Sequence, residues 1–135
     1  MNLEKSLNQP IVLAVDDNLD NLVLLEFQLA AVIDCAVVTA TTGEAALHIA
    51  EHGQPDLILL DILLPDISGI EVAQRLKQSP TTAQIPIVAL TALARNEDRD
   101  RILDSGCTDC LTKPYDLDDL QIVVNHHLSL PCAPL

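Results

Sequence analysis

The chain has 135 residues, the length of about one domain, and aromatic residues make up only 1% of it, so Leu, Ile, Val and Ala must build its core. The formal net charge is −13 at pH 7. Nucleic-acid binding needs cationic and aromatic side chains, and anionic membrane surfaces repel carboxylates, so we expect neither partner. No apolar run has the length of a membrane span or the place of a signal peptide, which predicts a cytoplasmic protein.

The predicted elements alternate along the chain, beginning with a strand. Five short, mostly apolar runs have the composition of strands that are buried on both faces. In chain order they are residues 11–15, 36–40, 56–60, 87–90 and 109–112. Each run is followed by a segment with apolar side chains at helical spacing. These segments are residues 18–32, 41–53, 68–76, 95–104 and 116–128.

Polar residues and glycines mark the ends of the predicted helices. The expected caps are Asn18, Asp116 and the capping boxes Thr41–Glu44 and Ser68–Glu71, and the expected stops are Gly53 and Gly106. The charge-dense helix over 95–104 should be buried mainly through Ile102 and Leu103. The last helix should turn Leu117, Leu120, Val124 and Leu128 inward.

Strict alternation of strands and helices predicts an α/β fold. A parallel sheet with helices on both faces and right-handed crossovers is the expected architecture. At this length we expect a flavodoxin-like doubly wound sheet of five parallel strands, a (βα)5 fold. One domain should span residues 11–129, between short tails at 1–10 and 130–135, with no output domain.

Polar side chains stand where the predicted strands end: Asp16, Asp17, Asp61, Thr91 and Lys113. The carboxyl ends of parallel strands meet at one edge, so we expect these groups to converge. An Asp after a strand is by itself more often a cap or a turn residue, and only the joint placement points to chemistry. Converging carboxylates repel one another unless a cation such as Mg²⁺ joins them. Asp61 is then the candidate nucleophile for an aspartyl phosphate, with Lys113 and Thr91 contacting the phosphoryl oxygens.

Two other classes of function use similar residues. A phosphatase of the haloacid-dehalogenase type needs a second Asp two residues after its nucleophile on the first strand, where this chain has Asn18. A thiol oxidoreductase could use Cys107 and Cys110, but this pair enters a strand rather than a helix N-terminus. Structural zinc would need a second ligand pair beside these cysteines, and His126 and His127 point to different sides of a helix.

Four segments resemble the receiver domain of two-component response regulators. They are Val12–Asn18, Leu59–Gly69, Ile87–Ala92 and Leu111–Pro114, and the similarity runs from about Ile11 to Leu128. The chain is most similar in character to single-domain receivers of the cell-cycle-regulator type.

This resemblance implies a role for each residue at the strand ends. Asp61 would be the phosphoacceptor, Asp17 would bind Mg²⁺ directly, and Asp16 would act largely through water. The Leu63 carbonyl would be a backbone ligand of the ion, and Thr91 and Lys113 would contact the phosphoryl group, with a cis Lys113–Pro114 bond. The phosphoryl group would come from a sensor histidine kinase or a histidine phosphotransfer protein, and the output would be contact with a downstream protein.

The sequence departs from the receiver pattern at three positions. Cys110 stands where receivers usually have a switching aromatic ring, so we expect it to stay in place while Thr91 shifts the backbone. Leu63 and Leu93, at the positions that tune phosphoryl lifetime, are apolar, which predicts a long-lived adduct. The candidate output surface is the charged segment 95–101 with the fifth strand and last helix. A degenerate receiver that binds without phosphorylation, or a thiol-regulated module, remains the alternative.

Overall fold

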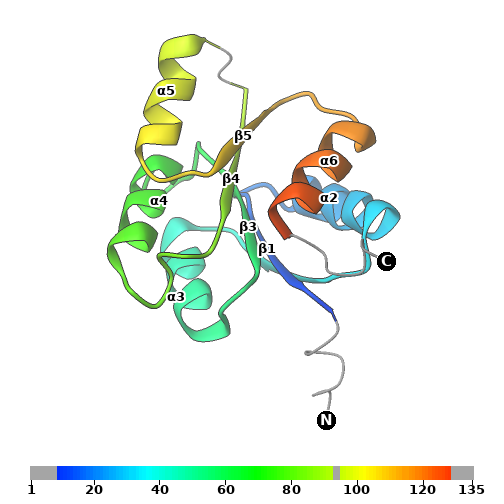
Figure 1. Cartoon of the computed structure of the whole chain (residues 1–135), viewed down its shortest axis with the longest axis horizontal. Helices are drawn as coiled ribbons and strands as arrows, with labels where there is room; N and C mark the ends of the chain where they lie inside the picture. The colour runs from blue at the N-terminus through cyan, green and yellow to red at the C-terminus, as the bar shows by residue number, and fades with distance from the viewer. Residues whose placement is uncertain (1–8, 93–94, 129–135) are drawn as a thin grey trace.

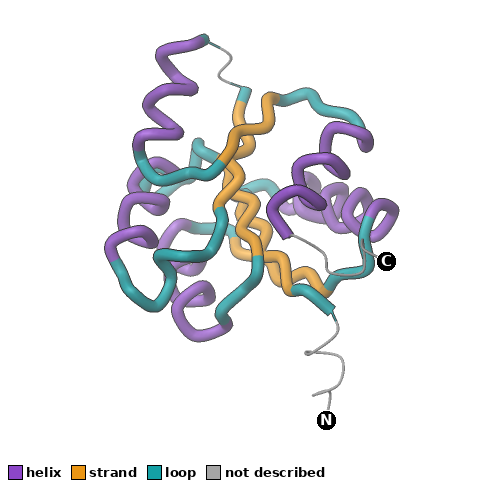
Figure 2. Tube along the Cα trace, viewed as in Figure 1, coloured by secondary structure: helices purple, strands orange, loops and turns teal. Residues whose placement is uncertain are grey.

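The computed structural model of the protein describes residues 9–92 and 95–128, and within them five parallel strands form one sheet (Figure 2). In chain order the strands are β1 (Ile11–Val15), β2 (Ala36–Ala40), β3 (Leu57–Asp61), β4 (Ile87–Thr91) and β5 (Asp109–Thr112). Their spatial order is β2-β1-β3-β4-β5. This is the predicted flavodoxin-like sheet, and its switch point lies between β1 and β3.

Helices cover both faces of the sheet (Figure 1). On one face lie α2 (Leu19–Val32) and α6 (Leu117–Leu128). On the other lie α3 (Gly43–Gly53), α4 (Gly69–Gln78) and α5 (Asn96–Asp104). Successive strand residues point to opposite faces, so each strand feeds two separate apolar cores. This double burial explains why the central strands are continuous apolar runs.

The helix caps follow the prediction at three of the helices. The side chains of Asn18, Ser68 and Asp116 accept the backbone N–H of the residue three positions later. In α3 the cap is Thr42 rather than Thr41, since the Thr42 hydroxyl accepts the Ala45 N–H at 3.1 Å. The left-handed residue after α3 is Gln54, with φ 48°, and Gly53 is the last helical residue.

Other expectations were wrong in detail. The third strand is Leu57–Asp61 rather than residues 56–60, because Asp56 uses its carboxylate to accept the Ile11 N–H at 2.8 Å. Leu103 and Leu117 are 41% and 43% exposed rather than buried. Leu103 follows the buried Ile102 directly, and one residue turns a helix by about 100°, which carries Leu103 away from the core that Ile102 enters. In α6 the buried positions are Leu120 and Val124.

Two glycines allow close approaches that fix the surroundings of the strand ends. A Cβ at Gly69 would lie 2.6 Å from the carbonyl oxygen of Asp61, so only glycine lets α4 begin against the end of β3. Gly106 has φ 115°, and it ends the turn after α5 beside the Lys77 side chain. In the described part of the chain, no helix has the length and apolar character needed to cross a bilayer.

Candidate functional site

Three carboxylates meet at the carboxyl end of the sheet. Val15 of β1 pairs with Leu60 of β3, so the next residues along the two strands, Asp16 and Asp61, lie side by side. With Asp17 they form a cluster in which one carboxylate oxygen from each lies within 4.8 Å of the others. Asp16 and Asp61 are only 3% and 9% exposed, whereas Asp17 faces solvent. The predicted convergence of these residues is therefore present.

Lys113 supplies the positive charge of the site. Its Nζ lies 3.5 Å from Oδ2 of Asp61 and 3.6 Å from Oδ2 of Asp16. The backbone of this lysine is held by its N–H, which donates to the Thr91 carbonyl at 2.7 Å. The Lys113–Pro114 bond is cis, as the resemblance implied. One ammonium thus bridges the two buried carboxylates.

Hydrogen bonds orient both buried carboxylates. Asp16 accepts the Asn18 N–H at 2.9 Å and the Asn21 side-chain amide at 3.2 Å. Asp61 accepts the Leu63 N–H at 3.0 Å. Asn21 was missed by the sequence reasoning, although its position one turn into α2, after Asp17, was a usable indication.

The electrostatics of Asp61 are those of a partly compensated charge. Burial raises the pKa of Asp61 most, and the neighbouring Asp16 raises it further, while the Leu63 N–H and the Lys113 ammonium lower it. Lys113 pairs with two of the three clustered carboxylates, so the cluster keeps an excess of negative charge. All the available donors are oxygens, which is the set that a hard divalent cation such as Mg²⁺ prefers, so the residues fit that ion.

The remaining predicted residues lie around this cluster. Thr91, the last residue of β4, is 2% exposed and follows Leu90, which pairs with Asp61. Leu63 is 68% exposed and follows Asp61 by two residues. Leu93 lies outside the described residues. The structure therefore brings Thr91 to the edge of the acidic cluster and leaves the Leu63 side chain at its surface.

A pocket of about 440 Å³ lies beside the carboxylates. Asp16 and Lys113 line its polar part, and Leu24, Leu90 and Tyr115 contribute to its apolar wall. The Tyr115 hydroxyl donates to the Gln28 side chain at 3.4 Å, which connects the end of β5 to α2. Burial, with a smaller contribution from Asp16, raises the pKa of Tyr115. This tyrosine lines the pocket and packs on the core beneath α2 and α6, whereas Cys110 packs in the opposite core.

Cys107 and Cys110 are buried free thiols in the core beneath α3, α4 and α5. Burial raises the pKa of the Cys107 thiol to about 11, and it also raises that of Cys110. Thiols with such pKa values stay protonated at neutral pH, and the thiolate is the reactive form. The geometry therefore favours packing over redox chemistry for this pair.

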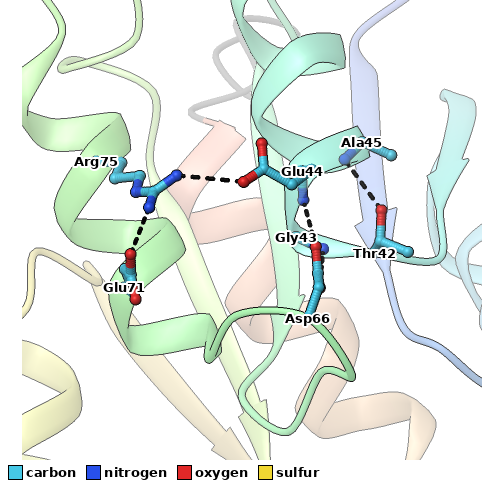
Figure 3. A network of polar contacts seen from close by, with 7 residues as sticks. All are labelled: Thr42, Gly43, Glu44, Ala45, Asp66, Glu71 and Arg75. Carbon is cyan, nitrogen blue, oxygen red and sulfur yellow. Dashed lines mark hydrogen bonds and ion pairs between the residues drawn. The ribbon is translucent and has the colours of Figure 1, made fainter.

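The loop after β3 is tied to the start of α3, as Figure 3 shows. Asp66 accepts the N–H of Gly43 at 2.8 Å and the N–H of Glu44 at 3.0 Å. These two bonds lower the pKa of the Asp66 carboxyl to about 2. Arg75 adds a second link by pairing with Glu44 and Glu71. Sequence reasoning missed this role of Asp66, because its partners lie more than twenty residues away.

Residues 12–125 match the response regulator receiver domain family. The chain belongs to this family. It is 46% identical over 105 residues to the response regulator PleD of Caulobacter vibrioides, covering 78% of this chain and only 23% of that protein. It is 38% identical over 103 residues to the polar-differentiation response regulator DivK of Brucella ovis, covering 76% of this chain and 83% of DivK.

A solved receiver domain also carries the ion that the acidic cluster suggests. It belongs to the sensor histidine kinase PA1611 of Pseudomonas aeruginosa PAO1 and has a magnesium ion coordinated in its active-site cleft. This receiver chain superimposes on it with a TM-score of 0.83 at 30% identity, over 90% of this chain and 98% of that one. The resemblance stated from sequence is thereby confirmed at the level of family and fold.

Proposed function

We propose that this receiver accepts a phosphoryl group on Asp61 in a Mg²⁺-dependent reaction. The arrangement that supports it most is the Lys113 ammonium, 3.5 Å from Asp61 and 3.6 Å from Asp16. A carboxylate with a purely structural role would have a cation of its own as partner. Here one cation is shared by Asp61 and Asp16, and a pocket lined by Asp16 and Lys113 opens beside them.

The proposed step exchanges one bond to phosphorus for another. A carboxylate oxygen of Asp61 attacks the phosphorus of a phosphohistidine, the O–P bond forms, and the P–N bond breaks. The histidine nitrogen leaves with the bonding electron pair and takes up a proton. Lys113 and the Thr91 hydroxyl stabilise the charge on the phosphoryl oxygens.

Asp16, Asp17, Asp61 and the Leu63 carbonyl would hold the divalent ion. When bound, Mg²⁺ offsets the repulsion among the carboxylates and the charge on the transferring group. Asn18 and Asn21 keep Asp16 in position while the ion is exchanged. In this proposal, as in the family, the chain is a signalling module rather than an enzyme with turnover.

The phosphodonor is proposed to be a sensor histidine kinase or a histidine phosphotransfer protein in the cytoplasm, and the output is proposed to be contact with another protein. Thr91 is the residue that would report the phosphoryl group, by shifting the backbone that leads toward α5. The Cys110 side chain is too small and too deeply buried to signal phosphorylation by moving between an inward and an outward position. Hydrogen exchange over residues 95–104 tests this route. Phosphorylation should change exchange there equally in the parent and in Cys110→Ser, and an effect lost in Cys110→Ser would contradict it.

The central experiment is incubation with acetyl phosphate and Mg²⁺ followed by intact mass measurement. We expect a single labile phosphoryl adduct that is absent in Asp61→Asn and after EDTA. The matched control is Asp20→Asn, which makes the same change at an exposed position outside the cluster and should leave the adduct intact. An unmodified parent mass would instead favour a receiver that binds its partner without phosphorylation.

A phosphatase reaction is the competing enzymatic hypothesis. It predicts steady turnover of p-nitrophenyl phosphate, whereas the receiver proposal predicts none. The buried state of Cys107 and Cys110 counts against the thiol-regulated alternative. Loss of the mass adduct after mild oxidation, restored by Cys107→Ser, would revive it.

A further inference from the structure

Two of the chain's four histidines lie on one side of α3, away from the carboxylate cluster. His48 and His52 are one turn apart in this helix, and both are exposed. Their ring centroids are 4.3 Å apart, and the planes are tilted by 36°. Side chains four residues apart on a helix share one face, so both rings reach the same region of solvent.

A hydrogen bond determines which nitrogen of His52 is available. Its Nδ1 lies 3.3 Å from the carbonyl oxygen of His48. A carbonyl oxygen can only accept, so Nδ1 is the donor in this contact, and the contact leaves Nε2 unengaged. Histidines that bind metals commonly donate their other ring N–H to a carbonyl or carboxylate in this way. Nε2 is therefore the nitrogen of His52 that this contact leaves to face an ion.

We propose that His48 and His52 form a second metal site, selective for a first-row transition ion such as Ni²⁺, Cu²⁺ or Zn²⁺. Imidazole nitrogens suit these ions, whereas carboxylate oxygens suit Mg²⁺, Ca²⁺ and Mn²⁺. A pair of histidines at this spacing on a helix is a known arrangement for zinc. The chain then has two cation sites of different chemistry, one at the sheet edge and one on α3.

The neighbouring carboxylates decide how many protein ligands the two histidines can be joined by. Glu44, one turn before His48, is drawn toward Arg75 at 3.4 Å, and Glu51 is exposed next to His52. Within residues 9–92 and 95–128, the only three-member group of candidate ligands is the Asp16, Asp17 and Asp61 cluster. The protein thus offers two nitrogen ligands here, and water completes the coordination. The net charge of −13 adds a general attraction for cations.

The other two histidines provide a matched control. The rings of His126 and His127 are adjacent in sequence and meet edge to face, with centroids 4.7 Å apart. His127 is also engaged by Asp109, with 3.1 Å between Nε2 and the carboxylate. These two rings do not present two free nitrogens to one ion. His126→Ala therefore removes one histidine without removing the proposed chelate.

The test is calorimetric titration of the untagged protein with Ni²⁺, in a buffer with excess Mg²⁺ to occupy the carboxylates. We expect one Ni²⁺ per chain in the parent and in His126→Ala. Binding should weaken by about tenfold or more in His48→Ala and in His52→Ala, because a chelate needs both rings. Far-ultraviolet circular dichroism and the acetyl phosphate reaction should be unchanged in all variants. Equal Ni²⁺ affinity in all four proteins, or loss only in His126→Ala, would overturn the proposal.

Discussion

The two ends of the three-helix face are held to the rest of the molecule very differently. At the α3–α4 end, Asp66 and Thr42 cap α3, and Arg75 joins the two helices. At the α5 end, Ile102 is the one buried residue of the helix. Its N-cap residue, Arg95, makes no side-chain hydrogen bond to the first turn. Asp98 pairs with Arg95 and Arg101, so these ion pairs join α5 only to itself and its cap.

This difference has a consequence for signalling. Elements with few buried contacts open at the lowest cost in free energy, and conformational switches use such elements. Asp61 lies against the tightly held α4, whereas Thr91 ends the strand that leads toward α5. In the proposed mechanism, phosphorylation therefore takes place beside the firmly attached α4, and its readout passes toward the weakly attached α5.

The largest effect on phosphorylation is expected at Lys113, the cation that bridges Asp16 and Asp61. Lys113→Gln removes the charge that stabilises the phosphoryl oxygens, and loss of one such group typically costs a factor of about 100 or more. The initial rate of adduct formation with acetyl phosphate, followed by mass, should fall accordingly.

Lys77→Gln is the matched control for that change. Lys77 donates to the carbonyls of Ala83 and Ile85, at 2.9 Å each, and stands at the opposite end of α4 from Gly69, which lies beside Asp61. Its loss should lower thermal stability and leave the phosphorylation rate close to that of the parent. Equal rate losses in both variants would show that Lys113 acts through general stability.

The second prediction tests how α5 is attached. Ile102→Ala should lower the free energy of unfolding by about 2–4 kcal/mol, as expected for a large buried aliphatic side chain. Leu103→Ala, one residue along, should lower it by less than about half as much, because that side chain is 41% exposed. Urea denaturation of the two variants measures both values. A loss of unfolding free energy in Leu103→Ala as large as in Ile102→Ala would mean that two residues anchor α5, and that α5 is not the weakly attached helix.

Sequence reasoning succeeded where a local pattern decides the outcome. Composition predicts the strand runs, and short-range hydrogen bonding predicts the caps at Asn18 and Ser68. The parallel order of the sheet predicts that the carboxylates at the ends of β1 and β3 meet. It failed at Leu103, because an apolar residue beside the core stripe is easily counted as part of it. It could not find the Asp66 cap on α3, since only the packed fold brings the two segments together.

The third prediction concerns the thiol in the core beside α5. Burial raises the pKa of Cys107 from 9.0 to about 11, and the Ser105 hydroxyl, with a smaller contribution from Lys77, opposes this shift. Below pH 9 both folded and unfolded chains keep the proton. Between pH 9 and 11 the unfolded thiol releases it while the folded one retains it, so stability falls as pH rises, by about 2–3 kcal/mol in total.

Comparison with Cys107→Ala isolates this contribution from other titrating groups. Urea denaturation at several pH values between 8 and 11 should give a steeper loss of stability in the parent than in the variant. Parallel curves would mean that the thiol is already solvated, and that the core beneath α5 is open in the resting protein.

The smallest effect is expected at Asp66, on the firmly held side. Asp66→Asn keeps one acceptor oxygen for Gly43 or Glu44 and removes the charge that favours the positive end of α3. Thr42 still caps the helix and its buried face is unchanged, so the midpoint of thermal unfolding at pH 7 should fall by only a few degrees.

The pH dependence of this effect follows from the pKa of Asp66, which is about 2 in the folded protein and below its usual value. The stabilisation by the Asp66 carboxylate is therefore fully present above about pH 4 and is lost as pH falls toward 2. The difference in unfolding midpoint between the parent and Asp66→Asn, measured at pH 7, 4 and 2.5, should therefore shrink as pH falls. The control Asp100→Asn, an exposed change on α5, should match the parent at pH 7. A drop at pH 7 as large as that of Ile102→Ala would mean that one carboxylate holds the α3–α4 end together, and the contrast between the two ends would no longer stand.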